Sequence, residues 1–237
     1  MGDKENTKNS TIYLIPYISF NNQFGLELYP TIWLEKNSWN FVGEYFVLNF
    51  PQETWGLGGD SPDSHETFVD GKQIRFHQNV LKGILPNLAI GIGYQYDKHF
   101  ELEIEDDEAR TKHPNLPETI KSTTVSSGIS LPIVYDTRKN INNPQQGMYA
   151  GITYLYNDTA LGSDDKWQSL FMDFRKYYSI PFARSILGFR SYYWTILSGD
   201  VPYFDLPSTR SEPGTGSASR GLQKDRYRSK DMLFIES

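Results

Sequence analysis

The side chains that could do chemistry are few, and they do not form a recognisable catalytic set. Asp60, Asp63 and His65 lie near Ser61, and these are the residue types of a hydrolase. They fall in a stretch rich in Gly, Pro and Asp, where chance clustering explains them better than a nucleophile with its base. The sequence contains no Gly-x-Ser-x-Gly, P-loop or Gly-x-Gly-x-x-Gly motif. We therefore expect a protein that is not an enzyme and needs no cofactor.

Metal and nucleic-acid binding are not indicated either. The sequence has no cysteine, and its four histidines, at positions 65, 77, 99 and 113, show no ligand spacing. An acidic run from Glu101 to Glu108 lacks the glycine and the spacing of a calcium loop, so we interpret it as a solvated loop. The formal net charge of -6 argues against broad nucleic-acid binding, because phosphate backbones attract basic proteins.

The elements that position these side chains are predicted to be β-strands. In residues 88–96, large apolar side chains alternate with small or polar ones, and glycines at every second position would break a helix. No convincing amphipathic helix is present. We therefore predict an all-β, antiparallel up-and-down meander of about nine or ten strands, each paired with its sequence neighbour. The same alternation recurs at 26–34, 128–135, 148–156, 169–175 and 187–193, and more weakly at 12–20, 39–50 and 71–81.

The second face of these strands is charged, and this leaves two architectures open. A soluble sandwich would bury the apolar faces and expose the charged ones to water, whereas a membrane barrel would turn the apolar faces to lipid and the charged ones to its lumen. Periodicity alone does not choose between them. No run of about 20 apolar residues occurs, so a helical membrane span is excluded. The charged positions are Glu27, Arg75, His77, Asp173, Arg175, Arg184 and Arg190.

The lengths of the connections favour the barrel. Short turns are expected at 36–38, 83–86 and 179–181, and they alternate with long polar segments. Two connections depart from this alternation: 21–23 is short where a long one is due, and 136–147 is long where a short one is due. One end of the sheet would then collect tight turns and the other end long loops, as in outer-membrane barrels. The long segments are 51–70, 99–121, 158–166 and 199–231.

Three motifs in chain order resemble the bacterial surface antigen barrel family, which includes the outer-membrane proteins BamA and TamA. The first is a strand followed by Asp136, Arg138, Asn143-Pro144 and Gly147. By residue chemistry alone these are turn formers, because Asp and Asn accept backbone hydrogen bonds and Pro fixes φ. In the family this pattern forms a turn on the periplasmic side. A second match covers residues 173–177 and 198–202.

The third motif is similar to the family's long sixth-loop signature. It consists of Arg220-Gly221 followed by Arg226-Tyr227-Arg228. The resemblance implies that this loop folds back into the lumen, where a buried arginine needs partners for its donors. We expect residues 220–228 on the concave side of the sheet, with the acids Asp173 and Glu44 as candidate partners inside the lumen. The sequence departs from the family pattern at Leu222, Asp225 and Ser229.

The resemblance implies a localisation in the bacterial outer membrane. It also implies assembly of outer-membrane proteins, or translocation of a polypeptide or lipid, with membrane lipid and unfolded outer-membrane proteins or a secreted polypeptide as partners. No chemistry would be needed. Two other classes stay open at this point, namely a passive porin-like channel, which predicts a water-filled lumen, and a soluble β-sandwich binding module, which predicts folding without detergent.

The composition of the N-terminus and the strand pattern also predict the domain organisation. Residues 1–10 are polar and are expected to be disordered, and they are too few to hold a periplasmic domain of the family. Residues 11–237 are expected to form a partial outer-membrane barrel with the long loop 199–231. The last strand should have only residues 232–237, so we expect an open sheet, with no ladder between 12–20 and 232–237.

Overall fold

The computed structural model describes residues 7–20, 23–49, 51–104, 120–180, 185–213 and 221–237. These residues form strands, connections and 3-10 turns, and each of the 3-10 turns has three residues. The elements are β1 (Thr11–Ile18), β2 (Phe24–Trp33), η1 (Glu35–Asn37), β3 (Trp39–Asn49), β4 (Gln52–Thr54), η2 (Asp63–His65), β5 (Thr67–Leu85), β6 (Leu88–Ile104), β7 (Thr123–Asp136), β8 (Gly147–Asn157), η3 (Thr159–Leu161), β9 (Trp167–Ile180), β10 (Ser185–Gly199), η5 (Tyr203–Asp205) and β11 (Asp231–Glu236).

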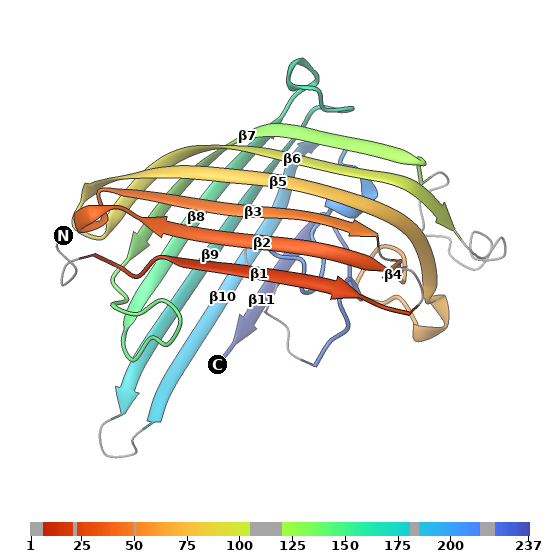
Figure 1. Cartoon of the computed structure of the whole chain (residues 1–237). Helices are drawn as coiled ribbons and strands as arrows, with labels where there is room; N and C mark the ends of the chain where they lie inside the picture. The colour runs from red at the N-terminus through yellow and green to blue at the C-terminus, as the bar shows by residue number, and fades with distance from the viewer. Residues whose placement is uncertain (1–6, 21–22, 50, 105–119, 181–184, 214–220) are drawn as a thin grey trace.

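All strands belong to one curved antiparallel sheet (Figure 1). The order is β1-β2-β3-β5-β6-β7-β8-β9-β10-β11, so each strand pairs with its neighbour in sequence, and the short β4 pairs with β5. This confirms the predicted meander. It has ten strands along the path and β4 outside it. Within the described part of the chain no ladder joins β1 to β11, so the sheet is open, as expected.

Two strands are longer than the alternation predicted. β5 starts at Thr67 and β6 continues to Ile104, inside segments that were expected to be connections. The reason is that β5 and β6 pair with each other beyond the apolar part of the sheet, up to the partners Val69 and Ile104. Backbone pairing therefore carries strand structure into polar sequence, where alternation gives no signal.

The convex face of the sheet is apolar and exposed. Ile92 is 57% exposed and Ile133 is 48% exposed, and no other described element covers them. The soluble sandwich alternative required a second sheet packed on this face. The described residues form a single sheet, so the sandwich fold of that alternative is wrong. Other large apolar side chains exposed on strands include Leu14, Leu26, Val47, Phe76, Leu131, Ile152, Leu187 and Ile235.

The main cluster of buried apolar side chains lies on the concave side. It joins Val69 and Leu102 of β5 and β6 to the 3-10 turn η5, which follows β10. We call the segment between β10 and β11 the 200–230 connection. Figure 1 shows its described parts, in blue, lying within the curve of the sheet.

The N-terminal residues differ from the expected disorder. The backbone N–H of Lys8 donates to Asn37 Oδ1 at 2.8 Å, and Lys8 Nζ lies 2.8 Å from Asp136 Oδ2. Residues 7–10 are therefore held at the end of the sheet where the β2–β3 and β7–β8 connections lie, because their polar groups find partners there. Residues 1–6 lie outside the described residues.

Candidate functional site

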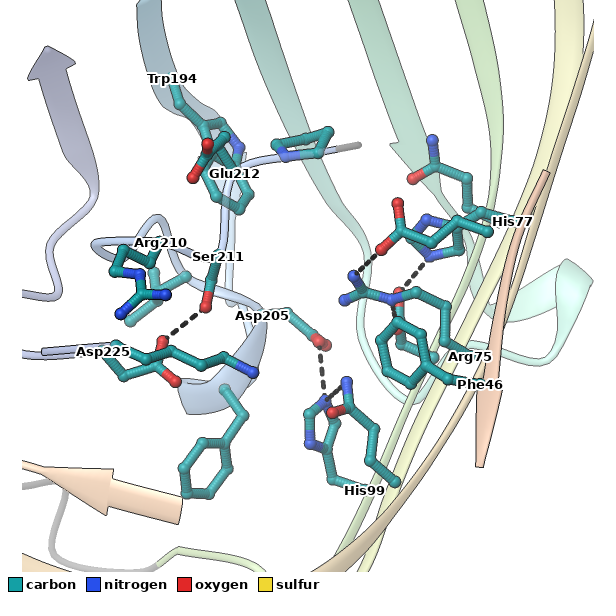
Figure 2. A pocket seen from close by; sticks show the side chains of 18 of the residues that line it. Phe46, Arg75, His77, His99, Trp194, Asp205, Arg210, Ser211, Glu212 and Asp225 are labelled. Atoms are coloured by element: carbon teal, nitrogen blue, oxygen red, sulfur yellow. Dashed lines mark hydrogen bonds and ion pairs between the residues drawn. The ribbon is translucent and has the colours of Figure 1, made fainter. Parts of the chain in front are cut away.

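The concave face of the sheet holds a cavity of about 280 Å³ between the strands and the 200–230 connection. Figure 2 shows Arg75, His77 and Phe46 of the sheet on one side of this space and Arg210, Ser211 and Asp225 of the connection on the other. The site is therefore a polar interior that a loop of the same chain partly fills.

A charge network lines the wall of this cavity. Arg75 donates from Nη1 to Glu44 Oε1 at 2.7 Å and from Nε to Asp97 Oδ1 at 2.5 Å. His77 Nε2 lies 2.5 Å from Asp97 Oδ2. The register explains the grouping, because Glu44 is opposite His77, and Arg75 is opposite Asp97, on one face of three adjacent strands. Each buried charge in the network therefore has a partner of opposite sign.

A second network lies on β9 and β10. Asp173 accepts hydrogen bonds from Arg175 Nε at 3.1 Å and from Arg190 Nη2 at 3.1 Å. Arg190 Nη1 also reaches Glu212 of the 200–230 connection at 3.5 Å. Here a cation belongs to the wall and the acid facing it belongs to the loop.

These networks correct the partners that the sequence suggested for the loop cations. Asp173 and Glu44 do lie on the concave side, but they pair with arginines of the sheet. The reason is proximity: a neighbouring strand presents its arginine a few ångströms away, and a short carboxylate side chain reaches no further. Among the described residues of the motif, Arg226 and Arg228 instead bond to other groups of the loops.

Arg228 is the most deeply buried of the loop cations that the structure describes, with 1% of its surface exposed. Its Nη1 donates to the carbonyl oxygens of Tyr203 at 3.0 Å and Leu206 at 3.3 Å, and its Nη2 lies 3.0 Å from Asp225 Oδ1. The guanidinium also lies over the rings of Tyr203 and Phe204. Arg228 therefore holds the two ends of the 200–230 connection together.

Arg226 and Tyr227 lie beside it. Arg226 Nη2 donates to the Ser61 carbonyl at 2.6 Å and to Asp63 Oδ1 at 2.8 Å, so it joins this connection to the one between β4 and β5. The Tyr227 N–H donates to Thr209 Oγ1 at 3.2 Å. Gly221 has a φ of +88°, which glycine adopts without strain. Arg220, the first residue of the motif, lies outside the described residues.

The other end of the sheet contains the turn motif of the β7–β8 connection. Arg138 donates from Nε to Asp136 Oδ1 at 2.9 Å, and its guanidinium lies over the Tyr149 ring. Gly147 has a φ of +111°, and a Cβ there would lie 3.1 Å from the Thr137 oxygen. The arrangement is that of a structural turn.

Asn143 also acts within this turn. Its N–H donates to Asn140 Oδ1 at 3.0 Å, and its own Oδ1 accepts a hydrogen bond from Gln145. Pro144 follows in the same segment and is half-buried. These bonds are local, as expected for Asn in turns.

Sequence reasoning missed one group of residues, which joins the wall to the 200–230 connection. Asp205 Oδ1 lies 3.2 Å from His99 Nε2, and Asp205 Oδ2 accepts a hydrogen bond from Ser126 Oγ at 2.5 Å. The only signal in the sequence is that Asp97 and His99 share one face of a strand. Nothing marks Asp205, because 106 residues separate it from His99.

Ligand atoms of Asp97, His99 and Asp205 lie within 4.8 Å of one another. Such a spacing suits a cation. Both carboxylate oxygens of Asp97, however, already contact Arg75 and His77, and a second cation beside Arg75 would be repelled. We therefore assign Asp97 to the charge network of the wall, and His99 and Asp205 to the contact between the wall and the 200–230 connection.

The fold and this interior define the class of the protein: it is the wall of a β-barrel whose polar lumen a long loop enters. No described helix is long and apolar enough to cross a membrane. The model of the Omp85 superfamily domain matches residues 16–206, more than half of the chain, and the chain belongs to this superfamily. No curated protein matches the chain. The superfamily is associated with the outer membrane and with insertion and translocation of polypeptides there.

Proposed function

We propose that this chain forms the wall of an outer-membrane barrel of the BamA/TamA type, which assists insertion of outer-membrane proteins or passage of a polypeptide or lipid. The observation that carries the proposal is the contrast between the two faces of one sheet. The convex face exposes Ile92 and Ile133, whereas the concave face holds Arg75 between two acids and receives the 200–230 connection. An apolar outside and a polar inside are what a membrane barrel requires.

The proposed role needs no covalent chemistry. Strand β1 pairs with β2 on one side only in the described part of the chain, so the backbone N–H and C=O groups of its other side can pair with an incoming strand. A substrate strand that pairs at such an edge forms backbone hydrogen bonds before it enters lipid, where unpaired backbone groups cost several kcal/mol. The partners would be membrane lipid and an unfolded outer-membrane protein or a secreted polypeptide.

A passive channel is the second candidate, and the structure gives it less support. A porin-like channel needs a continuous aqueous lumen. Here Phe204 and Asp205 of the 200–230 connection are buried against the wall, and Glu212 reaches Arg190. The loop therefore occupies space that a passive channel leaves to water.

Reconstitution of the full chain into lipid vesicles tests the proposal. An unfolded outer-membrane barrel protein is added outside, and its folding is followed by heat-modifiable gel mobility, while vesicles from the same batch report release of a small fluorescent solute. We expect severalfold faster folding than in empty vesicles, with little release of the solute. Release without faster folding would instead identify a passive channel. Vesicles containing the heat-unfolded chain serve as the control.

A further inference from the structure

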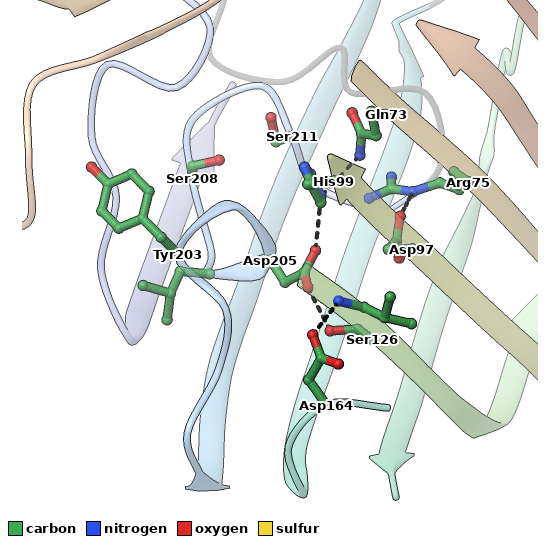
Figure 3. Close-up of polar contacts among 12 residues, drawn as sticks. Gln73, Arg75, Asp97, His99, Ser126, Asp164, Tyr203, Asp205, Ser208 and Ser211 are labelled. Atoms are coloured by element: carbon green, nitrogen blue, oxygen red, sulfur yellow. Dashed lines mark hydrogen bonds and ion pairs between the residues drawn. The ribbon is translucent and has the colours of Figure 1, made fainter. Parts of the chain in front are cut away.

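Asp205 makes a buried polar contact between the 200–230 connection and the sheet. It ends the 3-10 turn η5, in which all three residues are buried. Figure 3 shows its carboxylate between His99 on β6 and Ser126 on β7. Ser126 Oγ in turn accepts a hydrogen bond from Trp167 Nε1 of β9 at 3.3 Å. One side chain of the connection therefore bonds to a site that three strands build.

Apolar side chains cover this polar contact. Phe204 stacks on the His99 ring with a centroid distance of 5.5 Å and an interplanar angle of 17°. Tyr203, Phe204 and Leu206 pack in one cluster with Val69, which is 0% exposed. Access of water to the Asp205 carboxylate is thus limited to the side that faces the cavity while η5 stays in place. Its bonds to the wall are strengthened by this partial exclusion of water.

Several other bonds of the connection run within loops. Asp225 accepts from Ser211 Oγ at 2.7 Å, and Arg228 bonds to carbonyl groups of residues 203 and 206. Arg226 bonds to the connection between β4 and β5. These contacts do not tie the loop to the barrel wall. Tyr203 Oη also lies 2.5 Å from Thr54 Oγ1 of the short edge strand β4, and Glu212 lies 3.5 Å from Arg190 of β10.

We propose that Asp205, His99 and Ser126 form a releasable latch that holds the 200–230 connection against the barrel wall, and that opening of this latch lets η5 leave the lumen. Only the consequence for transport rests on the proposed function, because docking and release of η5 are properties of the chain itself. With the latch closed, Phe204 and Asp205 occupy the lumen. With it open, their place is free for a substrate polypeptide or for water.

Charges around Asp205 make the latch sensitive to pH. The groups that face Asp205 are Asp97 and His99 of β6, Arg75 of β5, the uncharged Ser126 of β7 and Arg228 of its own connection. Burial, and then the charge of Asp97, raise the pKa of Asp205 to about 7. A released carboxyl returns to an ordinary pKa of about 3.9. The docked state therefore holds its proton more tightly, so docking is strongest at acid pH and weakens as the pH rises towards 7.

Thiol labelling can measure release, because the natural sequence has no cysteine. Val69→Cys places a thiol of similar size beneath η5, and the full chain in detergent micelles is treated with a maleimide. The labelling rate of this thiol is divided by the labelling rate of Ser64→Cys, an exposed position. This normalisation removes the pH dependence that comes from ionisation of the thiol itself. We expect Asp205→Ala to speed labelling of the buried thiol about tenfold at pH 6. Asp165→Ala, which removes an exposed acid, should leave the rate unchanged.

Two further variants make the test decisive. Ser126→Ala removes one donor to Asp205 without changing a charge, and it should speed labelling severalfold; this variant also serves if Asp205→Ala does not fold. With Asp205 present, the normalised labelling rate should rise between pH 5 and pH 7 as docking weakens. Asp205→Asn keeps the shape of the side chain but cannot titrate, so this rise should disappear. Unchanged labelling in both Asp205→Ala and Ser126→Ala would overturn the latch, and a persisting pH dependence in Asp205→Asn would overturn its control by Asp205. Neither result depends on assisted folding in vesicles, so this proposal and the proposed function can fail separately.

Discussion

At the scale of single residues, the buried arginine Arg228 organises the loop. Its guanidinium has an acid and two carbonyl groups as partners and two aromatic rings beneath it. A buried pair of this kind adds little net stability compared with apolar residues, but loss of one partner leaves the other charge stranded. The sequence motif Arg226-Tyr227-Arg228 thus acts by joining loop segments.

Arg228→Ala should destabilise the fold by about 3–5 kcal/mol, because it leaves Asp225 buried without its cation. Arg210→Ala is the matched control. Arg210 belongs to the same connection, is exposed and makes a single bond of 3.4 Å to the Leu222 carbonyl, so its loss should cost no more than about 0.5 kcal/mol. Urea unfolding in detergent micelles measures both. Equal midpoints for the two variants would contradict the role given to Arg228.

Asp225 should make the loop sensitive to acid. Burial alone would raise the pKa of Asp225, but Arg228, Lys224 and the hydroxyl groups of Ser208 and Ser211 together hold the pKa below its usual range. A lowered pKa means that the ionised form contributes stability above about pH 3.9, and this stability is lost as the pH falls through the folded-state value. This pH dependence is opposite to the one expected from Asp205, whose raised pKa makes docking of η5 stronger at acid pH.

The urea midpoint should therefore fall between pH 5 and pH 3 in the natural chain. Asp225→Asn should have a lower midpoint at pH 6 and a smaller fall on acidification, because the amide cannot titrate. A parallel decline in both proteins would show that other carboxylates cause the acid sensitivity. The Asp205→Asn variant, measured alongside, separates the contribution of the latch.

At the scale of elements, the turns at one end of the sheet are tied to the segment that precedes β1. Lys8 Nζ lies 2.8 Å from Asp136 Oδ2 and 3.0 Å from the Asp136 carbonyl oxygen, 128 residues further along the chain. Arg138 bonds to the same carboxylate, and Lys8 also lies over the Trp33 ring. The segment therefore links the β2–β3 turn to the β7–β8 turn and fixes the spacing of the strands between them.

Lys8→Ala should lower the free energy of unfolding by about 1.5–3 kcal/mol, the range for hydrogen bonds that involve charged groups. The Lys8 side chain is only 12% exposed, so solvent screens its pair weakly. Lys121→Ala removes a cation that is 60% exposed and 3.4 Å from Asp165, and it should change stability by less than about 1 kcal/mol. Urea unfolding of both variants measures these changes. If Lys8→Ala lowered the free energy of unfolding no more than Lys121→Ala does, the link between the two turns through Lys8 would be refuted.

At the scale of the whole molecule, each strand separates an apolar convex face from a polar concave face. Ile92 and Gln95 lie three residues apart on β6 and therefore point to opposite faces. Gln95 lines the cavity, whereas Ile92 is on the exposed convex face. The two positions offer a comparison on one strand, with the backbone environment nearly constant.

Ile92→Arg should destabilise the chain in a lipid bilayer by about 2–4 kcal/mol, because it places a charge in hydrocarbon. Gln95→Arg should cost clearly less, since its guanidinium would lie among the polar groups of the lumen. Reversible unfolding from vesicles measures the difference. A convex face that met water would tolerate both substitutions, and this result would contradict the membrane orientation.

Much of this fold could be predicted from the sequence. Period-two alternation located the strands, and turn residues such as Asn143-Pro144 located the connection at 137–146. Antiparallel neighbours then follow because short chain segments between strands leave them few other partners. The polar extensions of β5 and β6 were missed, since backbone pairing there lacks an apolar pattern.

The candidate site depended on the tertiary structure. Ser126 and Asp205 are 79 residues apart, and His99 and Asp205 are 106 residues apart, so no local spacing connects them. The sequence by itself determined which faces are apolar and which are charged, because side chains alternate along a strand. The curvature of the sheet decided which charges meet, because it brings the 200–230 connection over β6 and β7. Each charged group then pairs with the nearest group of opposite charge or polarity. Asp173 and Glu44 bind arginines on their own or adjacent strands, whereas the described loop arginines Arg226 and Arg228 bind groups of the loops.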